Sequence, residues 1–67
     1  MKLIINGEAI DVPERIRTVA DLLEHFQLNK KIAIVEVNAC ILQKEQYATA
    51  TLNSGDRVEI VHFVGGG

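Results

Sequence analysis

The chain has 67 residues, 48% of them hydrophobic, and its seven basic and nine acidic side chains give a formal net charge of −2 at pH 7. A chain of this length forms one domain with a small core, and an aromatic content of only 4% makes that core aliphatic. The slightly acidic balance excludes the strongly basic footprint of a nucleic-acid-binding protein.

The first predicted element is a β-hairpin. Apolar residues run from 1 to 5, a second short run spans 8–12, and Asn6-Gly7 lies between them. Asn-Gly between two such runs is the strongest short-range hairpin signal, because both residues tolerate the positive φ of a type I′ turn. Alternation along the first strand turns Ile4 to the opposite face from its two neighbours.

A helix is predicted next, with Thr18 as its N-cap. Asp21 follows three residues later and is a weaker relative of the acid in a capping box. The helix is expected to end near residues 27–29. Its apolar residues recur at helical spacing and predict one stripe that packs as core: Val19, Leu22, Leu23 and Phe26.

The remaining chain predicts more strands. Residues 32–37 form an apolar strand, Ile41-Leu42 a short further strand, and residues 43–47 a helical turn in which Tyr47 packs under the loop. A dense turn cluster at 53–56 precedes the final strand, which begins at Arg57. The predicted fold is α+β: a mixed sheet of four to five strands with one helix across one face, the other face open, and the first and last strands parallel and central.

The final strand divides its side chains between the two faces. Val58 and Ile60 are assigned to the helix side, which leaves Val61 and Phe63 on the open face with Ile4 and Ile34. Exposed apolar groups gathered beside a chain end are typical of a docking surface; the alternative is that they pack against each other or against a loop. The predicted partner-binding residues are Ile4, Ile34, Val61, Phe63 and Val64.

The strand runs directly into Gly65-Gly66-Gly67. Glycine has no β-carbon, so such a segment fits a slot that excludes other residues, and it is costly to order. We predict a domain over 1–64 and a flexible tail over 65–67, with the Gly67 carboxylate as the working group. The alternative is an idle terminus.

These features together resemble a known family. The strand order, Val37-Asn38 after the third strand, Gly55-Asp56 before the last, and the terminal Gly66-Gly67 are similar to the ubiquitin-like (β-grasp) sulfur carriers of the ThiS/MoaD family. The short length, the segment 44–47 and the ending 60–67 resemble the thiamine-pathway branch more than the molybdopterin-synthase small subunit. The third glycine, Gly65, departs from the usual pair.

The resemblance implies a carrier that is not itself an enzyme. A ThiF-like adenylyltransferase would adenylate the Gly67 carboxylate with ATP, and sulfur from a cysteine desulfurase or a relay protein would replace AMP to give a thiocarboxylate. A ThiG-like thiazole synthase would then take the sulfur for the thiazole of thiamine. The carrier would bind no cofactor or metal, and ATP would be used by the activating partner.

Other functions stay open at this point. The same terminus would serve a molybdopterin-pathway carrier or a ubiquitin-like modifier joined to lysines of target proteins. A passive binding module would use the sheet and ignore the tail.

The remaining reactive side chains give weaker signals. Cys40 is the one cysteine, so no internal disulfide is possible, and an incidental role is favoured over a thioester or persulfide with a partner. His25 and His62 match no metal-ligand spacing with it. No stretch is long enough for a signal peptide or a membrane span. The expected location is the cytoplasm, with no nucleic-acid or membrane partner.

Overall fold

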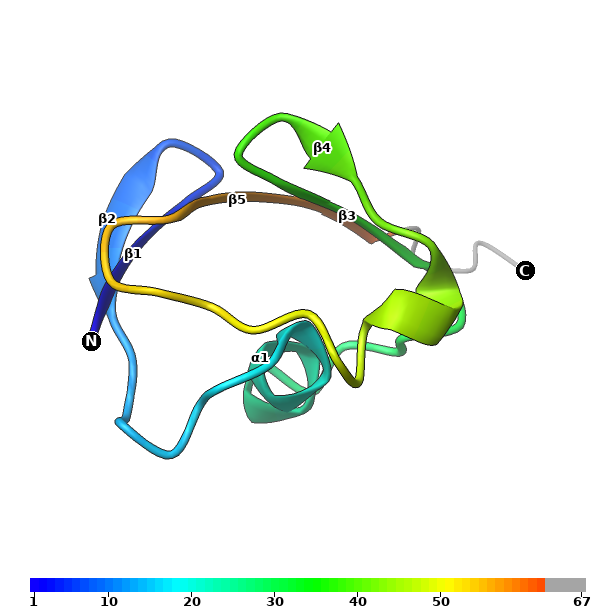
Figure 1. The fold of residues 1–67 in the computed structure, drawn as a ribbon, viewed down its shortest axis with the longest axis horizontal. Helices are drawn as coiled ribbons and strands as arrows, with labels where there is room; N and C mark the ends of the chain where they lie inside the picture. Colours follow the sequence, from blue (N-terminus) through cyan, green and yellow to red (C-terminus); the bar gives the residue numbers. More distant parts are fainter. Residues whose placement is uncertain (63–67) are drawn as a thin grey trace.

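The last strand, β5 (Arg57–His62), lies at the centre of a mixed five-stranded sheet (Figure 1). The structure is a computed structural model and describes residues 1–62. The predicted strand residues Phe63 and Val64 and the tail 65–67 lie outside the described residues. The other elements are β1 (Lys2–Ile5), β2 (Glu8–Asp11), α1 (Val19–His25), β3 (Ala33–Val37), β4 (Cys40–Ile41) and the 3₁₀ helix η1 (Lys44–Gln46).

The strand order is β2-β1-β5-β3-β4. β1 is parallel to β5, with Ile4 opposite Arg57, whereas β3 is antiparallel to β5 from Ala33 opposite His62 to Val37 opposite Val58. The predicted pairing of the first and last strands is therefore confirmed. The parallel pair needs a long crossover, and α1 is part of that crossover and covers one face of the sheet (Figure 1).

Two tight turns set the register on either side of β5. Asn6 and Gly7 have φ of 50° and 82°, as the predicted type I′ turn requires. Asn38 and Ala39 make a second such turn, with φ of 50° and 69°. This second turn corrects the predicted short strand at Ile41-Leu42: because the chain reverses within two residues, pairing begins earlier and β4 is Cys40–Ile41.

The ends of α1 follow from local hydrogen bonds. The Asp21 N–H donates to Thr18 Oγ1 at 3.1 Å, and the Thr18 N–H donates to Asp21 Oδ2 at 3.1 Å, so the predicted capping box is confirmed. At the other end Gln27 has a φ of 59°, and the Gln27 and Leu28 N–H groups donate to the Glu24 and Leu23 carbonyls. This left-handed cap stops the helix at His25.

The core lies between α1 and the covered face of the sheet. Tyr47 is buried as predicted, and its hydroxyl donates to the Ala33 carbonyl at 2.8 Å. The prediction that Phe26 belongs to the core is wrong: Phe26 is 36% exposed, because it is the C-cap residue where the helix ends. The buried hydrophobic residues are Leu3, Ile5, Val12, Ile16, Val19, Leu22, Leu23, Ala33, Val35, Tyr47, Leu52 and Val58.

We predict that Asp21→Asn lowers stability at neutral pH and that its difference from the parent protein closes as the pH falls. Hydrogen bonds from the Arg17 and Thr18 N–H groups hold the pKa of the Asp21 carboxyl below its ordinary value of 3.8. A carboxyl with a lowered folded pKa stabilises the fold above its unfolded pKa, and this contribution is lost as the pH falls through the folded value. Urea midpoints measured from neutral pH down to about pH 2 test this.

Glu24→Gln is the matched control, because Glu24 is an exposed carboxylate on the same helix. Its urea midpoint should follow that of the parent protein throughout. An Asp21→Asn deficit that persists unchanged at the lowest pH would contradict the assignment.

Candidate functional site

The face of the sheet away from α1 carries exposed apolar side chains. On β5, Val58 is fully buried toward the helix whereas Val61 is 51% exposed, so the predicted division of faces is confirmed. Ile34 is 42% exposed and is the register partner of Val61. Side chains directly opposite one another on neighbouring strands touch, so these two residues form one apolar pair near the end of β5.

The other predicted docking residues either lie elsewhere on the sheet or fall outside the described residues. Ile4 is half-buried and pairs with Arg57, at the start of β5, so the sheet does not place it beside Val61. Phe63, Val64 and the tail Gly65, Gly66 and Gly67 lie outside the described residues, and their roles stay predictions.

Ile41 on β4 belongs to the same face and was missed by the sequence reasoning. It is 66% exposed and lies opposite Glu36 of β3. The sequence did contain a signal for the turn before β4, because Asn38 is a residue type that accepts positive φ. That signal was weaker than Asn6-Gly7, because Asn38 is followed by alanine instead of glycine. We name Ile34, Val61 and Ile41 the open-face patch.

Two asparagines hold β5 from opposite sides. Asn6 Oδ1 accepts from the Ile60 N–H at 2.8 Å, and its Nδ2 donates to the Ile60 carbonyl at 3.2 Å. Asn38 Oδ1 accepts from the Arg57 N–H at 3.0 Å. Each asparagine also occupies the first position of a tight turn, so each turn is tied directly to the central strand.

His62 is the last described residue of β5 and is turned to the helix side. Its Nε2 accepts from the Asn29 N–H at 3.0 Å, so this nitrogen carries no proton in the bonded arrangement. The bond ties the end of β5 to the loop between α1 and β3. His62 is therefore engaged within the chain, which makes it a poor candidate for contacting a partner.

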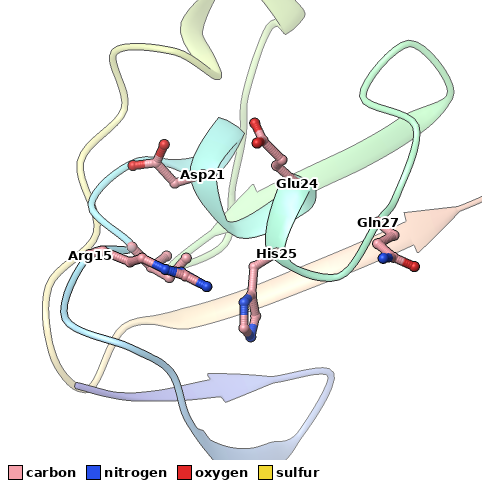
Figure 2. A pocket seen from close by; sticks show the side chains of 6 residues that line it. Arg15, Asp21, Glu24, His25 and Gln27 are labelled. Atoms are coloured by element: carbon pink, nitrogen blue, oxygen red, sulfur yellow. The ribbon is translucent and has the colours of Figure 1, made fainter.

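A polar hollow beside α1 does not have the features of a catalytic site. Figure 2 shows its labelled side chains pointing in different directions, and the Asp21 carboxylate already belongs to the helix cap. Cys40 is exposed and unpaired. Among residues 1–62 no three His, Cys, Asp or Glu side chains are grouped to hold a metal ion. No helix in that range is long and apolar enough to cross a membrane.

Comparison with known proteins agrees with this geometry. The model of the ThiS family matches residues 3–67. The sulfur carrier protein ThiS of Bacillus subtilis (strain 168) is 46% identical over 65 residues, which are 97% of this chain and 98% of that protein. The crystal structure of thiamine biosynthesis protein ThiS from Geobacter metallireducens superimposes with a TM-score of 0.83 at 32% identity, and each chain is fully covered. The predicted β-grasp fold is thereby confirmed.

A larger protein also contains a similar segment. The thiazole synthase of Paramagnetospirillum magneticum (strain ATCC 700264 / AMB-1) is 42% identical over 67 residues. The match covers all of this chain but only 20% of that protein.

We predict that Asn6→Gly accelerates hydrogen exchange of the Ile60 amide by about tenfold, since a lost hydrogen bond is worth about 0.5–1.5 kcal/mol. Glycine keeps the positive φ of the turn, so the substitution removes the side-chain bonds to Ile60 without straining the backbone. Native-state hydrogen exchange followed by NMR gives the measurement.

Asn38→Gly is the matched control, because it makes the same change at the turn on the other side of β5. It should accelerate exchange at Arg57 and leave Ile60 near its parent rate. Equal acceleration of both amides by both variants would mean that the asparagines act only through global stability.

Proposed function

The chain belongs to the ThiS family, and we propose that it is a sulfur carrier protein of thiamine biosynthesis that acts through the Gly67 carboxylate. The similarity along nearly the whole length of the Bacillus subtilis sulfur carrier is the observation that carries this conclusion. The fold supports it, because β5 lies at the centre of the sheet and is the last described element before the glycine segment in the sequence.

The proposed chemistry overcomes the low reactivity of a carboxylate. A carboxylate is a poor electrophile, because its charge repels nucleophiles and it has no good leaving group. A ThiF-like adenylyltransferase would use ATP to form an acyl adenylate at Gly67, with pyrophosphate released. The terminal sulfur of a persulfide on a cysteine desulfurase or a relay protein would then attack the acyl carbon and release AMP, and a thiol reductant would cleave the acyl disulfide so formed. The resulting thiocarboxylate presents a nucleophilic sulfur.

The proposed roles of the carrier and of its partner enzymes differ. The carrier needs no general base of its own, because its partners supply the chemistry by positioning the reacting groups. Its contribution is a terminus narrow enough to enter an active site and a rigid body by which the terminus is held. Three successive glycines provide the narrowness, since none has a β-carbon.

A thiazole synthase is the proposed acceptor of the sulfur. The segment of the Paramagnetospirillum magneticum thiazole synthase that resembles this chain supports the pairing, because a carrier-like sequence occurs within a protein of that name. The open-face patch is the proposed docking surface, together with Ile4, Phe63 and Val64. Covering exposed apolar side chains supplies the general driving force for association.

Removal of Gly67 should abolish sulfur loading, because the terminal carboxylate then lies on Gly66 and reaches about 3.3–3.6 Å less far into the partner's active site. Stability should stay unchanged, because the described core is built from other residues. Intact-mass spectrometry after incubation with ATP, the adenylyltransferase, a persulfide sulfur donor and a thiol reductant provides the test. The full chain should gain the mass difference of one oxygen replaced by sulfur, located by fragmentation at Gly67.

A reaction without ATP is the control and should leave the full chain unmodified. Sulfur loading of the shortened chain, or loading of the full chain at Cys40 instead of Gly67, would overturn the proposed mechanism.

We predict that Val61→Asp weakens binding to the thiazole synthase by about tenfold or more, since it places an unpaired charge in an apolar contact. Phe26→Asp is the matched control, because Phe26 is also an exposed large apolar residue but lies at the end of α1. Calorimetric titration of both variants, after circular dichroism has verified their folding, measures the difference. Equal affinity for both would remove the open face from the docking site.

A further inference from the structure

The open face places two glutamates directly opposite one another. Glu36 of β3 and Glu59 of β5 are register partners, and strand alternation puts both on the side away from α1. Side chains at directly opposite positions have β-carbons about 4.5–5.5 Å apart, and like charges there destabilise a sheet. This arrangement is therefore unfavourable for the isolated fold.

No cation within the described chain is paired with either carboxylate. Within residues 1–62 the ion pair that the structure contains joins the Met1 amino group to Glu14, at 3.1 Å. Arg57 lies on the same face two residues before Glu59, yet no ion pair joins its guanidinium to Glu36 or Glu59. The face keeps two adjacent negative charges that the fold itself does not neutralise.

Apolar residues border this pair on two sides. Ile41 lies opposite Glu36 on the β4 side, and Ile34 and Val61 occupy the next position along β3 and β5. A partner that covers Ile41 and Val61 together also covers Glu36, which lies between them, and meets Glu59 beside Val61. Removing two like charges from water is costly unless an opposite charge with hydrogen-bond donors accompanies them.

We propose that the open-face patch binds a surface of the thiazole synthase that presents an arginine among apolar side chains, with its guanidinium placed between Glu36 and Glu59. A guanidinium is planar and has five N–H donors, so it can serve two neighbouring carboxylates at once. This inference rests on the proposed function, from which it takes the partner, and adds the chemistry by which that partner is recognised.

Glu36→Gln and Glu59→Gln test the inference through two measurements with opposite expected signs. Each substitution removes the repulsion between the carboxylates, so the urea midpoint should stay equal or rise. Each also removes a charge-assisted contact, so the affinity of the full-length chain for the thiazole synthase should fall about tenfold. The salt dependence of binding should weaken in parallel.

Glu24→Gln on α1 is the control for a general change in net charge and should leave the affinity unchanged. If no arginine enters the site, removing a buried charge relieves desolvation, and the two open-face variants should bind equally well or more tightly; that outcome overturns the inference. Failure of the parent chain itself to bind the thiazole synthase would instead overturn the proposed pairing on which it rests.

Discussion

The placement of β5 between β1 and β3 is the constraint on which the rest of the structure depends. β5 follows all other described elements in the sequence, yet it forms the centre of the sheet. The sheet is therefore incomplete until the C-terminal strand has joined the N-terminal one. Because β5 pairs on both sides and buries Val58 beneath α1, it cannot leave its position without disrupting the core. β5, which precedes the glycine segment in the sequence, thus shares the stability of the whole domain.

Local signals in the sequence predicted much of this fold because the interactions behind them are local. Asn6-Gly7 specifies its own turn through backbone φ, and Thr18 and Asp21 specify the helix start through bonds spanning three residues. The positions of β4 and Phe26 were not predictable in the same way. Ala39 adopts a left-handed conformation that alanine disfavours, and it does so within a turn that Asn38 ties to β5 from 19 positions away.

The candidate site was predicted in part for a related reason. Alternation of side chains along β5 correctly placed Val61 on the open face, and the same alternation along β3 placed Ile34 there. Which residues are neighbours across strands depends on register, which alternation alone does not give. The register of β1 with β5 places Ile4 opposite Arg57, away from Val61, and the register of β3 with β4 places Ile41 on the open face. The role of Asn6 as a clamp on Ile60 joins residues 54 positions apart, and only the folded chain shows it.

The same register explains how an exposed apolar sheet face can discriminate between partners as well as bind them. An apolar surface made only of Ile34, Val61 and Ile41 would attract any apolar partner, including a second copy of the chain. Two facing carboxylates set among these residues penalise every partner that lacks a matching cation, because covering them without one removes charge from water uncompensated. Self-association through this face would bring four carboxylates together. The placement of Glu36 opposite Glu59 thus restricts which surfaces can cover the patch.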